Sequence, residues 1–197
     1  LSKSGRLVEA PCRDPWMPRR AFRRPYGVRK PKDYLPKAPG DIVQIDTAQV
    51  TIEEGLTFKH FTACDVFSRW QVLEAHSRAT AHAAAGFLHT VLERMPFPVR
   101  AIQVDGGSEF MAQFETACED RGIRLFVLPP RSPKLNGHVE RSQRTHRQEF
   151  YRRVQLPASL KLINKALRRW ENVHNCHRPH QGLQFKTPQA FLNELAA

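Results

Sequence analysis

The chain has 197 residues, 41% of them hydrophobic, which suffices for one compact domain with appendages. Its 31 lysines and arginines outnumber 19 aspartates and glutamates, so the net charge is +12 and the sequence pI about 10.1. A polyanion is the expected partner, nucleic acid ahead of an acidic membrane surface, and no apolar run reaches the roughly 20 residues of a membrane span. We therefore expect a soluble, intracellular protein without membrane association.

Residues 1–40 differ in composition from the rest. They hold seven of the 15 prolines and the basic run PRRAFRRPYGVRKPK. Prolines at this density forbid a long helix or a central strand, so an extended basic arm is predicted. The arm can follow a phosphate backbone or link to an upstream domain, and both interpretations remain open. The residues of the arm expected to contact DNA are Arg19, Arg20, Arg23 and Arg24.

Three strands and a helix are predicted next. Residues 41–50 alternate with period two, which places Asp46 in mid-strand on the more polar face. Residues 57–66 and 69–75 are β-rich and close enough in sequence for an antiparallel hairpin. The following apolar residues repeat at helical spacing, and Thr80 precedes them as a cap.

The second half alternates strands and helices. The expected elements are a strand at 99–104, a helix from Ser108 to Gly122, a strand at 123–127, a loop at 128–137, helices at 136–153 and 157–175, and a last helix from Pro188. Three antiparallel strands followed by this order predict the α/β class, with a mixed five-stranded sheet flanked by helices. We expect a core at residues 41–155 and a helical extension of it at 156–197.

Three carboxylates in distinct settings suggest a metal site. Asp46 lies in a strand, Asp105 closes a strand before a Gly-Gly turn, and Glu140 lies in a basic helix. Reactive groups gather at strand carboxyl ends, where loops open into a crevice. Clustered carboxylates raise one another's pKa unless a cation holds them ionised. Oxygen ligands favour Mg²⁺ or Mn²⁺, and two such ions about 3.5–4 Å apart support in-line displacement at a phosphodiester.

Each carboxylate also has a plain structural explanation. Asp46 can be a partly exposed strand residue, and Asp105 can begin a glycine-rich turn. Glu140 can be a solvated helix charge paired with Arg144 at i+4. Asp65 is a further acid in the hairpin, and its position at a strand end favours a turn role.

The helix that carries Glu140 also carries groups suited to phosphates. Gln143, Arg144 and Arg147 follow Glu140 at i+3, i+4 and i+7, on one face. Arginines there can neutralise phosphates and position a DNA strand, while a solvated basic face is the alternative. Further expected DNA contacts precede this helix, at Arg131, Lys134 and Asn136.

Six segments together resemble a known family. They are GDIVQIDT, KHFTACDVFSRW, AIQVDGGSEF, PPRSPKLNGHVERSQRTHRQEFY, NCHRPHQGL and KTPQAFL. In order and approximate spacing, over about residues 40–192, they resemble the catalytic core of bacterial insertion-sequence transposases in the retroviral-integrase superfamily. The resemblance implies an RNase H-like fold, a DDE triad of Asp46, Asp105 and Glu140, and metal-dependent cleavage and strand transfer of double-stranded DNA.

The same resemblance implies an upstream helix-turn-helix domain, a homo-oligomer in the active complex, and a place at the nucleoid in the bacterial cytoplasm. Because the first residue is leucine rather than methionine, we expect that an upstream domain is missing. A nuclease that cuts without joining, and an inactive DNA-binding relic, are the alternative functions.

Two departures from the family pattern bear on the site. Gly106 stands where the family often has asparagine, and 34 residues separate Asp105 from Glu140, one fewer than the usual gap of about 35 in the resemblance. The motif NGHVER favours Glu140 over Glu149 as the third ligand.

A zinc site is the last candidate. The four cysteines form no Cys-x-x-Cys pair, which indicates neither zinc nor a disulfide framework. His174, Cys176, His177 and His180 straddle a predicted helix end and a proline, so a structural role is preferred for them over zinc binding.

Overall fold

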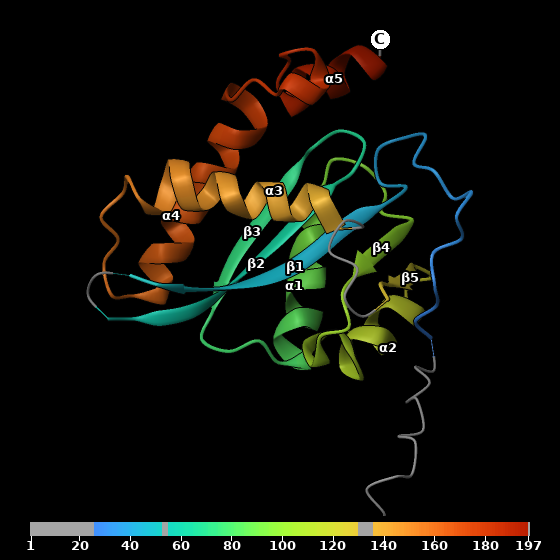
Figure 1. Cartoon of the computed structure of the whole chain (residues 1–197), viewed down its shortest axis with the longest axis horizontal. Helices are drawn as coiled ribbons and strands as arrows, with labels where there is room; N and C mark the ends of the chain where they lie inside the picture. The colour runs from blue at the N-terminus through green and yellow to red at the C-terminus, as the bar shows by residue number, and fades with distance from the viewer. Residues whose placement is uncertain (1–25, 53–54, 130–135, 197) are drawn as a thin grey trace, which may run out of the picture.

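The protein is built on a mixed five-stranded sheet in the order β3-β2-β1-β4-β5, which confirms the expected fold class (Figure 1). The computed structural model describes residues 26–52, 55–129 and 136–196. The strands are β1 (Val43–Thr51), β2 (Thr57–Asp65), β3 (Gln71–His76), β4 (Ala101–Val104) and β5 (Arg124–Val127). The first three are antiparallel neighbours, whereas β4 and β5 run parallel to β1, as expected from the crossover helices.

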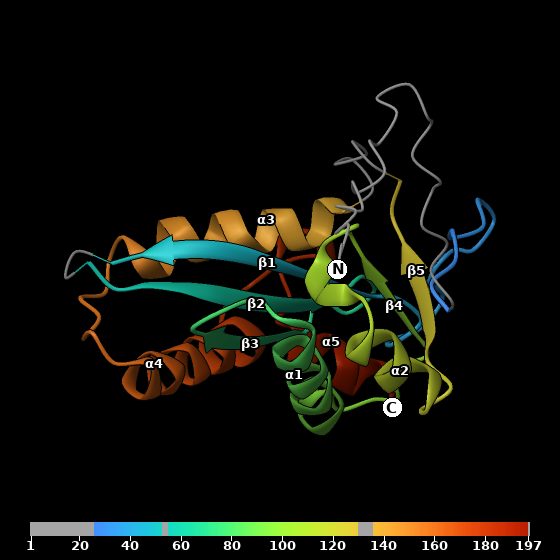
Figure 2. The same ribbon diagram turned by 90° about the horizontal axis from the view of Figure 1, so that it is seen from below.

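Helices cover both faces of the sheet (Figure 2). The α-helices are α1 (Ala81–Arg94), α2 (Gln113–Glu119), α3 (Gly137–Thr145), α4 (Leu160–Asn172) and α5 (Pro188–Leu195). Helix α3 lies on one face, and α1 lies on the other with α2. Within the described part of the chain, no helix is long and apolar enough to span a membrane.

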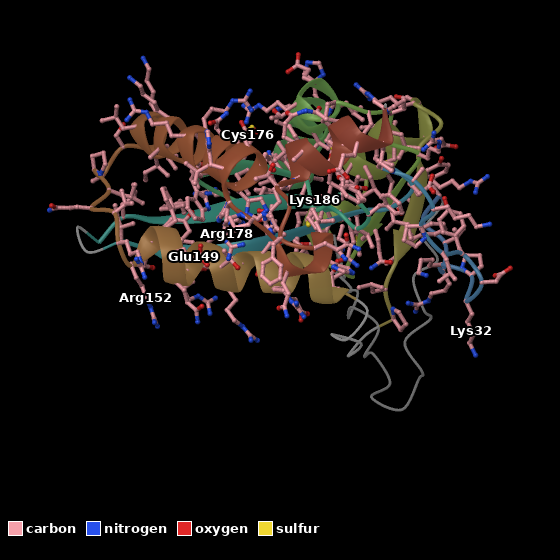
Figure 3. The ribbon with its side chains drawn as sticks, turned by 90° about the horizontal axis from the view of Figure 1, so that it is seen from above. Lys32, Glu149, Arg152, Cys176, Arg178 and Lys186 are labelled. Atoms are coloured by element: carbon pink, nitrogen blue, oxygen red, sulfur yellow. The ribbon has the colours of Figure 1, made fainter. Side chains whose placement is uncertain are left out.

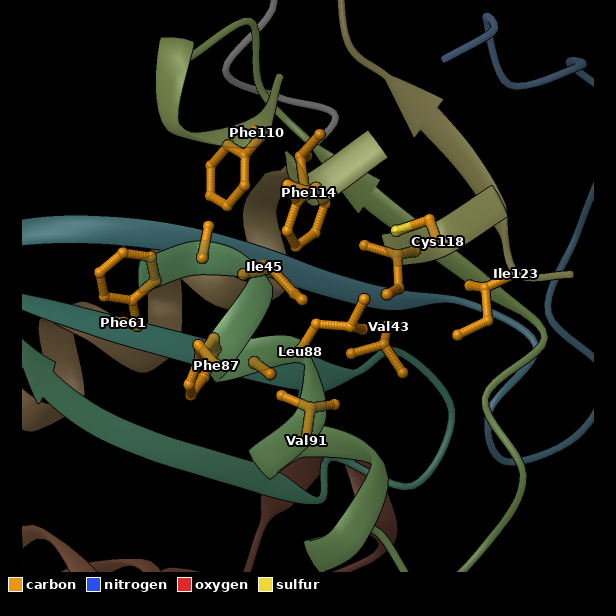
Figure 4. Close-up of a cluster of buried hydrophobic side chains, with 14 of the residues drawn as sticks. Val43, Ile45, Phe61, Phe87, Leu88, Val91, Phe110, Phe114, Cys118 and Ile123 are labelled. Carbon is orange, nitrogen blue, oxygen red and sulfur yellow. The ribbon is translucent and has the colours of Figure 1, made fainter. Parts of the chain in front are cut away.

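The main core lies between the sheet and the α1 and α2 side (Figure 4). Alternation along β1 turns Val43 and Ile45 into this core, while the intervening residues face α3. Helix α1 contributes Phe87, Leu88 and Val91 at helical spacing, all fully buried. These are the positions at which the sequence periodicity predicted an apolar face.

Helix boundaries follow local signals only in part. Thr80 Oγ1 accepts a hydrogen bond from the Ala83 amide at 3.1 Å, which confirms the predicted cap of α1. The expected helix from Ser108 to Gly122 is instead divided into a 3₁₀ turn, η1 (Ser108–Phe110), and α2. Ala112 has a φ of 47° between them, a backbone conformation that no regular helix contains.

The two long C-terminal helices each end in a wider turn. Helix α3 continues as the π-helical turn η3 (His146–Tyr151), and α4 continues as η4 (Val173–His177). In η3, His146 and Phe150 are both buried. The sequence predicted continuous helices over these regions, because periodicity does not separate α-helix from a single π turn.

The last part of the predicted arm is extended but packs on the core. Val28 forms a parallel bridge with Phe126, and its amide donates to the Leu125 carbonyl at 2.9 Å. The Tyr26 hydroxyl donates to the Ile123 carbonyl at 2.8 Å. Residues 26–29 therefore cover the outer edge of β5, which would otherwise expose unpaired backbone groups.

Side chains cover the opposite edge of the sheet. Three residues of α4 and η4 accept hydrogen bonds from alternate backbone amides of β3, at 2.7–2.9 Å. These pairs are Asn164 with Ala75, Glu171 with Leu73, and Asn175 with Gln71. The C-terminal helices are thus bonded to the edge strand as well as packed against it.

Candidate functional site

Asp46 and Asp105 come together because β1 and β4 are parallel neighbours. The register pairs Val43 with Ile102 and Gln44 with Gln103, and its continuation by two residues places Asp46 level with Asp105. Asp46 lies on the β1 face covered by α3, and Asp105 follows directly after β4. The strand register is thus the feature that brings the two aspartates to the same level of the sheet.

The surroundings of Asp46 raise its pKa to about 6. Burial is the largest cause, and the charges of Asp105 and Glu140 raise the pKa further. Two hydrogen bonds act in the opposite direction: the Thr47 amide donates to Oδ1 at 2.8 Å, and Gln143 Nε2 donates to Oδ2 at 2.9 Å. Asp46 therefore interacts electrostatically with both other members of the predicted triad.

Glu140 is exposed in the first turn of α3, which Gln44 anchors to the sheet. Gln44 is buried, and its Oε1 accepts hydrogen bonds from the amides of His138 and Val139, each at 3.2 Å. A side chain two residues before Asp46 thus fixes the start of the helix that carries Glu140. The sequence indicated only that Gln44 shares the polar face of β1.

Glu109 is a fourth carboxylate at this site, and we did not single it out from the sequence. Its Oε1 accepts a hydrogen bond from Thr47 Oγ1 at 2.6 Å. A Cβ atom at Gly107 would lie 2.6 Å from Glu109 Oε2 and 2.9 Å from Asp105 Oδ1, so the two carboxylates flank this glycine. The only sequence signal is the acid four residues after Asp105 in DGGSEF.

The space at Gly107 gives a test of this arrangement. Gly107→Ala should lower catalytic rate by about 10²-fold with little loss of stability, because a new methyl group must displace the Asp105 and Glu109 side chains. Gly106→Ala is the matched control, since nothing lies within 4 Å of a Cβ there. Rate and urea-unfolding midpoints of both variants check the prediction, which equal rates would contradict.

The predicted DNA contacts have different surroundings. Arg144 and Arg147 are exposed along α3 and η3, as predicted, whereas Gln143 turns inward to Asp46. Asn136 is 4% exposed, so its side chain is not on the surface where a DNA contact was expected; it precedes α3, whose start packs on the sheet. The other predicted contacts lie outside the described residues: Arg19, Arg20, Arg23, Arg24, Arg131 and Lys134.

The competing acids are engaged elsewhere. Asp65 Oδ1 accepts from the Gly40 amide at 2.9 Å, and Oδ2 accepts from the Ser68 amide at 2.6 Å and its hydroxyl at 2.7 Å, which confirms the turn role. Glu149 pairs with Arg178 through two hydrogen bonds of 2.7 and 2.8 Å. Neither acid therefore replaces Glu140 beside Asp46.

The C-terminal histidines lie in different settings. His174 is buried, and its carbonyl oxygen lies 3.2 Å from His180 Nε2, with the two rings in edge contact. His177 is exposed. The described contacts of His174 and His180 are those of packing residues.

The donor chemistry at Asp46 fits a hard divalent cation. The charges of Asp105 and Glu140 both raise the pKa of Asp46, and a cation would offset this repulsion. Among residues 26–52, 55–129 and 136–196, no three acidic, histidine or cysteine side chains are drawn together closely enough to hold a metal ion. Asp46 is instead bonded to Gln143 and Thr47.

Comparison with known sequences gives a consistent family. Two family models, both described as Integrase core domain, match residues 36–133 and 121–188, and together they span residues 36–188. The chain is 30% identical over 111 residues to the ORF3 protein of Spiroplasma virus SpV1-C74, whose name assigns it as an integrase. That match covers 50% of this chain and 30% of the viral protein, so the chain spans under a third of this relative.

Solved structures share the fold. The chain in the simian T-cell lymphotropic virus intasome in complex with the PP2A regulatory subunit B56 gamma matches with a TM-score of 0.67 and 22% identity, over 86% of this chain and 58% of that one. The HTLV-2 integrase catalytic core domain in complex with magnesium matches with a TM-score of 0.60 and 17% identity, over 77% and 94% of the two chains. At these identities the likeness establishes the fold.

Proposed function

The chain belongs to the integrase core domain family, and on that basis we propose that it is the catalytic core of a DNA transposase or integrase. It would cleave DNA and join the 3′ ends of a mobile element to target DNA. One observation carries this proposal: Asp46 lies level with Asp105 on neighbouring strands, and both Asp105 and Glu140 raise its pKa. The charges of Asp105, which follows β4, and of Glu140 in α3 thus act on the carboxylate of Asp46 in β1.

We assign Asp46, Asp105 and Glu140 to the binding of Mg²⁺ or Mn²⁺, with room in the proposal for two ions. When bound, such ions activate a water or 3′-hydroxyl and stabilise the departing oxygen. The HTLV-2 integrase core was solved in complex with magnesium, which supports the assignment. Gln143 holds the Asp46 carboxylate in place, and Arg144 and Arg147 face outward where phosphates would lie.

The rest of the proposal follows from the same family. The partners are double-stranded element ends and target DNA, and the active complex is a homo-oligomer, because two ends are joined together. We place the core at residues 41–155, its helical extension at 156–197, and a basic arm at 1–40. The proposed location is the nucleoid in a bacterial cytoplasm.

Asp105→Asn tests the function. The variant should lose Mn²⁺-dependent plasmid nicking and joining of a 3′-hydroxyl duplex oligonucleotide by at least about 10³-fold, because it removes one charged oxygen ligand while preserving shape. Asp120→Asn is the matched control, since Asp120 is exposed at the end of α2. Undiminished DNA joining by Asp105→Asn would contradict the assignment of Asp105 as a metal ligand.

The same assay separates the alternative functions. Wild-type protein that nicks but never joins a pre-cleaved end is a nuclease without strand transfer. Protein that binds duplex DNA with strong salt dependence but does neither is a catalytically inactive DNA-binding relic.

A further inference from the structure

A cavity of about 620 Å³ lies on the flank of α3 that faces away from Asp46. Arg141 lines this cavity, whereas Gln143 reaches Asp46. Two residues correspond to about 200° around a helix, so α3 separates the two sites. The other walls come from the β2–β3 turn, from β3 and from the segment 178–185. This volume lies within the range of roughly 300–1,000 Å³ typical of small-ligand sites.

The charged side chains that line this cavity are all arginines: Arg69, Arg141 and Arg178. Arg178 is neutralised by Glu149, and Figure 3 shows the two meeting where the C-terminal segment crosses η3. Within the described part of the chain, Arg69 and Arg141 form no ion pair. Asp65 acts on Arg69 through its charge, whereas no carboxylate of the described residues pairs with Arg141.

Arg69 is fixed in its orientation at the wall of the cavity. Its φ of 64° is held by the Asp65 turn, and its Nη1 contacts the Val66 carbonyl and lies 2.6 Å from His138 Nδ1. A Cβ atom at Gly182 would lie 3.7 Å from Arg69 Nε and 3.8 Å from Nη2, so this edge of the guanidinium lies beside the 178–185 segment of the cavity wall. Burial lowers the pKa of Arg69 and the neighbouring charge of Arg141 lowers it further, so an anion between the two would stabilise both.

The floor of the cavity is formed by buried polar residues. Gln71 and His174 line it and are each 2% exposed. Gln71 Nε2 donates to Ser142 Oγ at 2.6 Å, whereas Gln71 Oε1 makes no hydrogen bond within the described chain, and the His174 ring interacts with the Arg69 backbone. These atoms are shielded from solvent, so the ligand contacts of the cavity come from its more exposed residues.

An aromatic ring stands at the rim. Phe185 lines the cavity and is 72% exposed. It follows Gln184, and the two have φ values of 63° and 55°, conformations that cost about 1 kcal/mol or more each. The Phe185 amide donates to the His180 carbonyl at 2.9 Å, which holds the loop and keeps the ring out of the core.

We propose that this cavity binds one nucleotide of a single-stranded DNA segment: Arg69 and Arg141 hold its phosphate, and Phe185 stacks on its unpaired base. An exposed ring stacks on a base only when that base is unpaired, which selects single strands over duplex. The inference rests on the proposed function in that the phosphate belongs to DNA, and it adds a second strand contact behind α3.

Binding of an about ten-nucleotide labelled oligo(dT) in EDTA, followed by fluorescence anisotropy, tests the proposal. Arg141→Gln and Phe185→Ala should each weaken binding by at least about fivefold. Arg169→Gln is the matched control, because this exposed arginine of α4 does not line the cavity, and it should change affinity less than about twofold. Inorganic phosphate should compete with the oligonucleotide for wild type and for Phe185→Ala, but not for Arg141→Gln.

Equal losses of affinity in Arg141→Gln, Phe185→Ala and Arg169→Gln would mean that DNA binds a diffuse basic surface, and would overturn the proposal. Unchanged affinity for the single-stranded oligonucleotide in Phe185→Ala would also overturn it. Arg141 and Phe185 are both exposed, so the variants should fold, and unchanged melting temperatures verify this. The binding assay contains no metal ion, whereas DNA joining requires one. The expected affinities can therefore be observed in a protein that fails to join DNA, and DNA joining can be observed when these affinities are not.

Discussion

Replacing Asp46 by asparagine should raise the free energy of unfolding of the metal-free protein at pH 7 by about 1–2 kcal/mol and reduce strand transfer by at least about 10³-fold. The gain arises because the folded protein holds an ionised carboxylate among two like charges in a partly buried place. Asparagine has the same shape and no charge. Gln143 can rotate its amide to present Oε1 to the new Nδ2.

The raised pKa of Asp46 determines how its contribution to stability changes with pH. The pKa of Asp46 is 3.8 for the unperturbed group and about 6 in the folded protein, so the folded state binds the proton more tightly. The stabilisation is complete below pH 3.8 and is lost as pH rises through 6. The full shift corresponds to an upper limit of about 3 kcal/mol, which partial solvent contact reduces to about 1–2 kcal/mol.

Urea unfolding in EDTA at pH 4 and pH 7 measures the difference between Asp46→Asn and wild type. The difference should be present at pH 7 and nearly absent at pH 4. Asp120→Asn, an exposed control, should show none at either pH. Added Mg²⁺ should then stabilise wild type but not Asp46→Asn, because only the folded wild type binds the ion. A variant less stable than wild type at pH 7 contradicts the prediction.

Local patterns in the sequence predicted those parts of the fold that depend on neighbours in the chain. Alternation placed Asp46 on one strand face, Thr80 capped α1 as expected, and Asp65 made its turn. Pro188 begins α5 as predicted, because a proline suits the first helical turn. Each of these features depends on residues only a few positions apart in the chain.

Long-range contacts could not be predicted in the same way. Gln44 bonds to His138, 94 residues away, and Glu109 bonds to Thr47, 62 residues away. Nothing local distinguishes these side chains from ordinary polar positions on a strand or a turn. The triad was predicted from the sequence because acids in a basic chain are conspicuous, whereas Gln44 and Glu109, which contact its surroundings, carry no such contrast.

The contacts at the edge of β3 also could not be predicted from the sequence. Residues that bond to it recur at intervals of seven and four along α4 and η4, whereas their partners recur every two residues along the strand. Each spacing suits its own element, since a helix returns to one face after four or seven residues and a strand after two. Only the docked pair of elements reveals that the polar helix positions replace a missing neighbouring strand.

Glu171→Ala should therefore destabilise the protein by about 2–4 kcal/mol. Glu171 is 5% exposed, its Oε2 accepts from the Leu73 amide at 2.9 Å, and it pairs with Arg94 at 3.4 Å and with Arg168. Alanine leaves the Leu73 amide buried without an acceptor and removes the counter-charge of Arg94. Burial raises the pKa of Glu171, so the desolvation of its carboxylate offsets part of the stabilisation by these contacts. This limits the stability that Glu171→Ala is expected to lose.

Matched variants on the same helix isolate the strand bond. Glu171→Gln keeps an acceptor for Leu73 but loses the charge, so its cost should be about half that of Glu171→Ala. Asn172→Ala, at an exposed position next to it, should change stability by under about 0.5 kcal/mol. Urea unfolding and amide hydrogen exchange at Leu73 measure these effects. Faster exchange at Leu73 in Glu171→Ala, with slow exchange kept in Asn172→Ala, is the expected result, and unchanged exchange in both would show that packing alone holds α4 on the edge strand.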